Sequence, residues 1–124
     1  MSDLQDSTTA IAQAKKAGLD VVFPKPNELQ IDIDDDDSLK AFARTCSVVD
    51  QYWGIKSETK APSKSGKPGR FHITIVLGRE VNGTERIALQ SALGSDRMRE
   101  VLSLIRLLEK DPYPTLFIER KEKK

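Results

Sequence analysis

Hydrophobic and polar residues alternate over residues 28–34, and this period of two predicts a β-strand with one buried face. Ile31 and Ile33 fall on the buried face, whereas Asp32 and Asp34 fall on the polar face. The two carboxylates are therefore expected on the same side of a sheet, close to the carboxyl end of the strand.

The rest of the chain divides into further strands and helices by the same test. A β-branched run over residues 71–77 predicts the most strongly marked strand. Apolar residues at helical spacing predict helices over residues 38–53 and 84–111, the second interrupted at residues 94–96. Shorter strands are predicted over residues 19–23, 55–59 and 115–120.

From residue 28 onward this order predicts an α+β fold of the split β-α-β-β-α-β type. Right-handed crossovers through both helices would give one antiparallel four-stranded sheet with the helices on one face and the other face open. Residues 19–120 are expected to form this single domain. Residues 1–18 are expected to be a flexible or helical extension, and residues 121–124 a charged tail.

Four consecutive aspartates run from Asp34 to Asp37, directly after the first strand of the four. Asp35 to Asp37 precede or begin a helix, where negative charge suits the helix dipole, and they need no further role. Asp32 and Asp34 are a candidate metal pair, because phosphoryl-transfer sites hold Mg²⁺ or Mn²⁺ through carboxylate oxygens. The alternative interpretation is that the outer face of any half-buried strand carries polar residues.

His72 is the only histidine, and it lies at the start of the strongest predicted strand. Alternation places it with Thr74 and Val76 opposite the apolar face, on the open face expected to carry the aspartates. A neutral histidine there could hydrogen-bond a phosphate or a hydroxyl. The alternative is an ordinary surface or interface histidine. The H-x-T signature of two-histidine phosphoesterases is excluded, because that chemistry needs a second histidine.

A loop rich in lysine, serine and glycine precedes this strand. Glycine backbones that approach closely and cationic side chains are what a bound phosphate requires, so the loop is a candidate phosphate site. Its candidate ligands are Lys60, Ser63, Lys64, Ser65, Lys67 and Arg70. The G-x-x-x-x-G-K-[ST] pattern of P-loops is absent, and a mobile basic loop without function is the alternative interpretation.

The last predicted strand ends in Glu119, and it can lie beside the Asp32 strand in a split βαβ sheet. The Glu119 carboxylate is therefore expected near Asp32. Tyr52, Trp53 and Tyr113 could stack on bases, although Trp53 also fits a helix core.

Composition narrows these alternatives only in part. The chain has 124 residues and a formal net charge of +1, from 20 basic and 19 acidic residues, so nucleic-acid binding by bulk charge is not expected. The single cysteine, Cys46, excludes an internal disulfide or a cysteine zinc site and is expected in the core. Because no apolar run has the length of a membrane span and no secretory signal is apparent, we expect a cytoplasmic protein without membrane contact.

Three stretches together resemble the archaeo-eukaryotic primase and primase-polymerase superfamily, whose catalytic core is an RRM-like split βαβ sheet. "LQIDID" resembles its two-acid strand and implies Asp32 and Asp34 as metal ligands. "SKSGKPGRFHITI" resembles its Ser-x-His motif and implies His72 as a nucleotide-phosphate contact, with Arg70 where the pattern has serine. "TLFIE" resembles its third strand and implies Glu119 as the third acid.

The resemblance covers about residues 28–120, and the chain is shorter than the usual catalytic module of that superfamily. It therefore implies a minimal or degenerate relative of phage or plasmid type, acting in DNA replication or mobile-element biology.

Three hypotheses about function follow. The first is a nucleotidyltransferase whose catalytic residues Asp32, Asp34 and Glu119 hold Mg²⁺ or Mn²⁺, while His72 and the basic loop hold the triphosphate. The second is a non-catalytic module that binds a nucleotide or single-stranded nucleic acid through the open sheet face and the loop. The third is an accessory protein that binds a protein partner or a second copy of itself. The short chain places binding and accessory roles ahead of catalysis.

Overall fold

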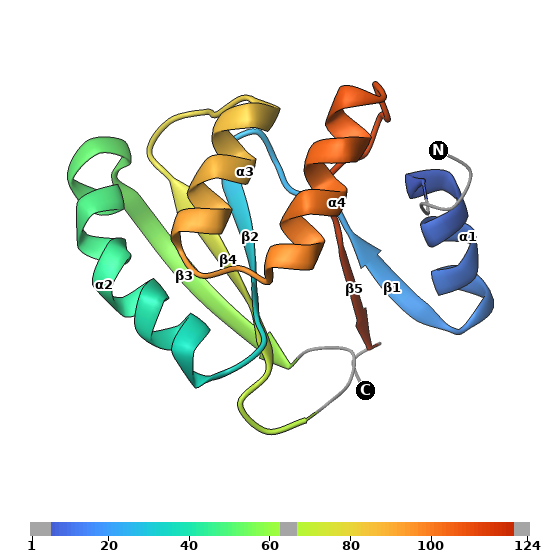
Figure 1. The fold of residues 1–124 in the computed structure, drawn as a ribbon, viewed down its shortest axis with the longest axis horizontal. Helices are drawn as coiled ribbons and strands as arrows, with labels where there is room; N and C mark the ends of the chain where they lie inside the picture. The colour runs from blue at the N-terminus through green and yellow to red at the C-terminus, as the bar shows by residue number, and fades with distance from the viewer. Residues whose placement is uncertain (1–5, 63–66, 121–124) are drawn as a thin grey trace.

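The protein is described by a computed structural model over residues 6–62 and 67–120. It is an α+β fold, as predicted, and its helices and strands are interspersed along the chain (Figure 1). In chain order these are α1 (Ser7–Lys16), β1 (Leu19–Val22), β2 (Glu28–Ile33), α2 (Asp36–Trp53), β3 (Ile55–Pro62), β4 (Phe71–Leu77), α3 (Gly83–Ala92), α4 (Arg97–Leu108) and β5 (Phe117–Arg120). No helix in the described residues is long and apolar enough to cross a membrane.

The main sheet is antiparallel and three-stranded, in the order β2-β4-β3. One face packs into the core against α2 and α3, which lie in front of the sheet in Figure 1. The fully buried residues on this face are Leu29, Ile31, Ile33, Ile73 and Ile75. Because burial of each aliphatic side chain contributes about 1.5–3 kcal/mol, the alternation of β2 and β4 fixes which face turns inward.

The opposite face of β2 and β4 carries the polar candidates. β2 pairs with β4 in a register that sets Asp32 opposite His72 and Gln30 opposite Thr74. Directly opposite residues in an antiparallel pair share a face, so the predicted convergence of the aspartate strand and the histidine strand is confirmed.

The prediction of a single four-stranded sheet is wrong. β5 does pair antiparallel, but with β1, and the two form a separate two-stranded sheet. In Figure 1, β5 runs between β2 and β1, and α1 lies beyond β1. The final strand is therefore a neighbour of β2 in space without forming a backbone ladder with it.

Side chains occupy the backbone groups of β2 that a fourth strand would use. The Gln30 N–H donates to Gln90 Oε1 at 2.8 Å, and the Gln30 carbonyl accepts from Arg99 Nη1 at 2.6 Å. Gln90 comes from α3 and Arg99 from α4, so the two helices satisfy this edge in place of β5.

The backbone N–H and carbonyl of Asp32, which point to the same edge of β2, are also hydrogen-bonded outside the sheet. The Asp32 N–H donates to Ser95 Oγ at 3.0 Å, and the Asp32 carbonyl accepts from the Asp96 N–H at 2.8 Å. A buried backbone group must find a partner, and these groups have found theirs in the α3–α4 connection.

Arg99 joins the two sheets. Besides the Gln30 carbonyl it donates to the Leu116 carbonyl at 3.1 Å, and its guanidinium lies 4.6 Å from the centre of the Phe117 ring. Its charge is compensated by Glu100, whose Oε2 is 2.7 Å from Nη1. One charged side chain therefore links β2 to the beginning of β5.

The termini of α2 follow from local chemistry. The Asp35 side chain accepts the Ser38 N–H at 2.8 Å, so the helix begins at Asp36, two residues before the predicted start. Gly54, with φ of 74°, ends it as predicted. Cys46 packs against the core from this helix, as expected, and burial raises the pKa of its thiol.

Candidate functional site

An aspartate, the histidine and a glutamate meet where three strands come together. Asp32 Oδ1 of β2 lies 3.7 Å from His72 Nε2 of β4. On the other side of the ring, Glu119 Oε2 of β5 lies 2.9 Å from His72 Nδ1. Each ring nitrogen of His72 therefore faces a carboxylate from a different strand.

The ring of His72 is also held on its flat side. It stacks on the Phe117 ring, with centroids 4.0 Å apart and planes inclined by 5°, and only 7% of the residue is exposed. A ring with a hydrogen bond at its edge and an aromatic ring on its face has little room to rotate. The fold thus fixes the orientation of His72.

Asp34 lies one residue past the end of β2 and pairs with Arg70, whose Nε is 3.4 Å from Asp34 Oδ1. The two side chains are 46% and 40% exposed, so this ion pair contributes little to stability. Both groups could therefore turn to a bound ligand at low cost.

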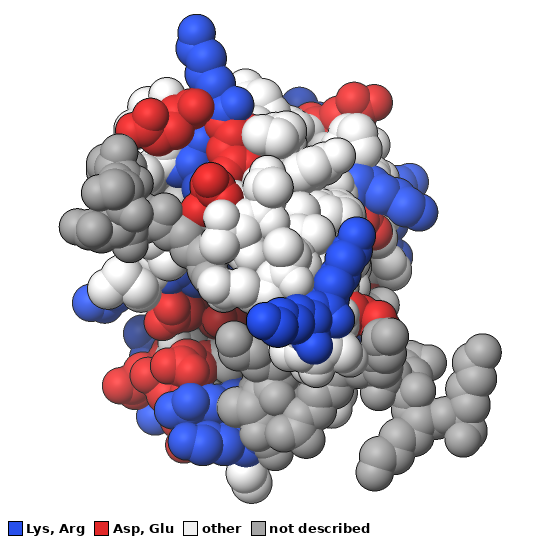
Figure 2. Space-filling view, turned by 90° about the vertical axis from the view of Figure 1, so that its right-hand side faces the viewer, with Lys and Arg blue, Asp and Glu red and all other residues white. Residues whose placement is uncertain are grey.

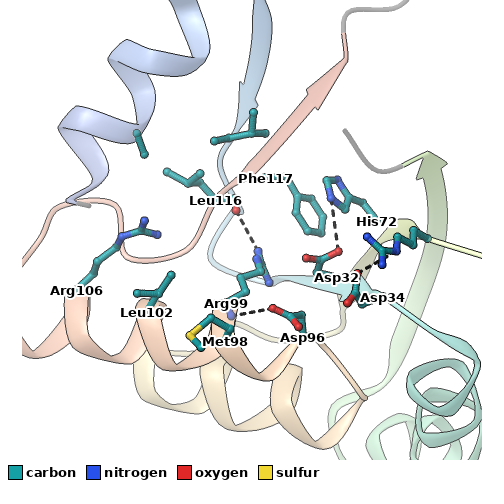
Figure 3. A pocket seen from close by; sticks show the side chains of 13 residues that line it. Asp32, Asp34, His72, Asp96, Met98, Arg99, Leu102, Arg106, Leu116 and Phe117 are labelled. Atoms are coloured by element: carbon teal, nitrogen blue, oxygen red, sulfur yellow. Dashed lines mark hydrogen bonds and ion pairs between the residues drawn. The ribbon is translucent and has the colours of Figure 1, made fainter. Parts of the chain in front are cut away.

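These residues border one cavity of about 360 Å³ (Figure 3). Small-molecule sites in proteins are typically about 300–1,000 Å³, so the cavity could hold one small ligand. The predicted residues that border it are Asp32, Asp34, Arg70 and His72. In Figure 3, Asp34 and His72 lie on one side of the cavity, and Arg106 and Leu102 on the other.

Asp32 and Arg99 both border this cavity, and burial shifts the pKa of each. Burial raises the pKa of Asp32 above its usual value, and the carboxylates of Asp96 and Asp34 act in the same direction. His72 and Arg99 oppose that rise. A carboxyl group with a raised pKa gains from a cation placed beside it, because the cation favours its charged form. The fold by itself therefore favours the neutral form of Asp32, and a cation beside it would favour the charged form.

Glu119, the predicted third metal ligand, lies behind His72 and is not among the residues bordering the cavity. In residues 6–62 and 67–120, no three side chains of His, Cys, Asp or Glu are grouped so that they could hold a metal ion. Asp32 and Asp34 still suit Mg²⁺, which proteins often hold through one or two carboxylates together with water and substrate phosphates. A cation here would need oxygens from its ligand.

The basic loop contributes less to the cavity than the sequence indicated. Three of its candidate ligands lie outside the described residues: Ser63, Lys64 and Ser65. Lys60 lies opposite Ile73 in the β3–β4 register, so its side chain is on the helix side of the sheet. Lys67 does not border the cavity either, which leaves Arg70 as the described loop residue that does.

The aromatic candidates for base stacking lie away from this cavity. Tyr52 packs edge-on against Trp53, with centroids 4.6 Å apart, and the Arg79 guanidinium lies 4.0 Å from the centre of the Tyr52 ring. Trp53 is half-buried and packs against the core, as its helical position allowed.

Tyr113 borders a second cavity, of about 610 Å³, between α1 and β1. Its ring lies 4.6 Å from that of Phe23, and the other walls include Ile11, Leu19 and Val21. Figure 2 faces this side of the molecule and shows a broad uncharged area with basic and acidic side chains around it. None of the candidate catalytic residues borders this second cavity.

Sequence reasoning missed three charged residues on the first cavity, namely Asp96, Arg99 and Arg106. Asp96 caps α4, accepting the Arg99 N–H at 3.0 Å, so the interruption in the helical pattern was the available signal. Met98, Leu102 and Arg106 are spaced four apart and share one face of α4. That spacing defines a face, but only the packing of α4 shows that the face borders the cavity.

Comparisons with known protein families, with curated proteins and with solved structures found no match to this chain.

Proposed function

We propose that the protein binds a nucleotide, together with a divalent cation, in the cavity bordered by Asp32, Asp34, Arg70 and His72. The observation that carries this proposal is the gathering of these residues, from one end of the β2–β4 pair, on one cavity sized for a single small ligand. The function is one of binding, and transfer chemistry is not required by it.

The divalent cation follows from the balance of charges. Asp32, Asp34 and Asp96 all border the cavity, and their carboxylates would repel a bare phosphate. Mg²⁺ or Mn²⁺ bridging Asp32 and Asp34 to phosphate oxygens would turn that repulsion into attraction. Arg70 and His72 stand beside this position as further contacts for the phosphates.

A nucleotide is favoured over a stacked single strand by the face on which His72 lies. The described residues that share this face on β3 and β4 include Ser57, Thr59, Thr74 and Val76, which offer no aromatic ring. Modules that bind single-stranded nucleic acid on an open sheet depend on such rings for base stacking. Binding at the cavity is therefore favoured over binding along the open sheet face.

Isothermal titration calorimetry with a nucleoside triphosphate and Mg²⁺ tests the proposal. Asp34→Asn removes one carboxylate from the cavity and should weaken binding about tenfold or more, because a carboxylate–cation contact is lost. Asp36→Asn is the matched control: it removes the same charge from the same acidic run, but from the exposed first turn of α2. Its affinity should equal that of the native protein.

Three outcomes would count against the proposal. Nucleotide affinity that is unchanged when EDTA replaces Mg²⁺ would rule out the cation. Equal losses of affinity in Asp34→Asn and Asp36→Asn would rule out the cavity as the binding site. Metal-independent binding of a single-stranded oligonucleotide, with no binding of the nucleotide, would favour a strand-binding surface instead.

A further inference from the structure

The cavity has two chemically different ends. Its charged end holds Asp34 and His72, with Arg70 paired to Asp34, whereas the other end is formed mostly by apolar side chains together with Arg106 (Figure 3). The apolar side chains that border the cavity are Ala10, Met98, Leu102, Leu116, Phe117 and Ile118. They come from three separate parts of the chain: α1, α4, and β5 with the residue just before it.

The wall from α4 is a defined row of side chains. Met98 and Leu102 are one helical turn apart and both border the cavity. Leu104 and Leu108 lie on a different face of the same helix and are exposed away from the cavity. The helix therefore presents one apolar face to the cavity, where Met98 is still 66% exposed, and another to solvent.

The wall from α1 is kept in place by a polar contact. The Ser7 N–H donates to Asp111 Oδ2 at 2.8 Å, and the Ser7 hydroxyl donates to the other carboxylate oxygen. Ser7 is fully buried, and Ala10, one turn later, is 3% exposed and borders the cavity. A small side chain at this position leaves the apolar end open.

We infer that this apolar end receives the base of the nucleotide, with the phosphates directed to Asp34, Arg70 and His72. The inference rests on the function proposed above and deepens it, because it makes the ligand a mononucleotide held at both ends. A base is flat and largely apolar on its faces, and a polarizable thioether such as that of Met98 packs well on such a ring. Leu102 supplies the aliphatic contact beside it.

The test compares two ligands by calorimetry, each with Mg²⁺: tripolyphosphate, which carries no base, and a purine nucleoside triphosphate. The native protein should bind the nucleotide about tenfold more tightly, because the base buries apolar surface. Leu102→Ala should remove most of that difference without changing the affinity for tripolyphosphate. Leu104→Ala, the same substitution on the outer face of α4, should keep the difference. Thermal unfolding of each variant checks that it is folded.

Each other outcome overturns a separate claim. If both ligands bind the native protein equally well, the base site is wrong and the phosphate site stands. If neither ligand binds, the proposed function fails, and this inference fails with it. If the nucleotide keeps its advantage in Leu102→Ala, the base lies elsewhere and the inference is overturned.

Discussion

The two edges of β2 are joined to the rest of the protein in different ways. Along one edge, β2 and β4 exchange backbone hydrogen bonds in a continuous register from Glu28 to Ile33. Along the other edge, the backbone of β2 is bonded to side chains and to the α3–α4 connection, including Gln90, Ser95 and Arg99. The neighbouring strand, β5, pairs with β1 instead.

This difference explains where the candidate site lies. A backbone ladder sets strands about 4.7–4.9 Å apart, too close for a ligand between them. Where side chains replace the ladder, β5 stands off from β2, and the cavity is bordered by Asp32 on one side and by Leu116 and Phe117 on the other. The edge that failed to form a four-stranded sheet is the edge that holds the cavity.

The largest expected effect comes from replacing Arg99, which binds the edge of β2 that is bonded to side chains. Arg99→Met should lower the free energy of unfolding by about 3–5 kcal/mol, because it leaves the buried carboxylate of Glu100 without its positively charged partner and cuts the link from Gln30 to Leu116. Urea denaturation followed by circular dichroism measures this change.

Two further variants separate the causes of that loss. Arg97→Met, an exposed arginine on the same helix, should change stability by less than about 0.5 kcal/mol. Arg99→Met combined with Glu100→Gln should recover part of the loss, since no buried charge is then left unpaired. An Arg99→Met protein as stable as the Arg97→Met control would show that the side-chain edge does not hold the sheets together.

The contrast between the two edges also marks what the sequence could predict. Alternation is a local pattern, so it was sufficient to place Asp32 and His72 on one face. The split βαβ order predicted Glu119 near Asp32 through a strand paired beside β2, whereas β5 pairs with β1 and Glu119 bonds to His72. The choice of β1 as the partner of β5 depends instead on contacts far apart in the chain. Arg99, for example, bonds to Gln30 across a separation of 69 residues.

The candidate site was predictable to the same extent. Asp32, Asp34, Arg70 and His72 lie on or beside predicted strands, and they border the cavity. Glu119 reached the site in a different role, as the hydrogen-bond partner of His72. The apolar end was not predictable, because α4 has apolar side chains on more than one face, and only tertiary packing selects the face that borders the cavity.

A second prediction concerns α1, whose first residue, Ser7, is hydrogen-bonded to Asp111. Asp111→Ala should lower the free energy of unfolding by about 1–3 kcal/mol, because the buried N–H and hydroxyl of Ser7 lose their acceptor. Glu109→Ala, which removes a nearby exposed acid, should have an effect within about 0.5 kcal/mol. Equal stability of these two variants would mean that the contact does not anchor α1.

The same variant has a pH signature. Burial tends to raise the pKa of Asp111, but hydrogen bonds from Ser7 and Tyr113 outweigh it and hold the pKa below the usual 3.8. An acid with a lowered pKa stabilises the folded protein above its unfolded pKa, and this contribution is lost as the pH falls through the folded value. The stability gap between the native protein and Asp111→Ala should therefore be constant above about pH 5 and narrow as the pH falls below 3.8.

The smallest predicted effects are those of replacing two acids, Asp32 on β2 and Asp35 at the start of α2. The Asp35 side chain caps α2, and the Ser38 N–H that it accepts lowers its pKa. Asp35→Ala should lower the melting temperature by about 4 °C, as the loss of one helix cap does in a domain of this size. Asp32→Asn should not lower it at pH 7, because burial raises the pKa of Asp32 and the fold therefore favours its neutral form.

Ligand binding should reverse the order of these two variants. In the presence of nucleotide and Mg²⁺, Asp35→Ala should gain as much in melting temperature as the native protein, because Asp35 does not border the cavity. Asp32→Asn should gain little, because it lacks a carboxylate next to the proposed cation. If nucleotide and Mg²⁺ raise the melting temperature of Asp32→Asn as much as that of the native protein, the ligand does not bind at Asp32. Asp32 would then be only a polar residue on the strand.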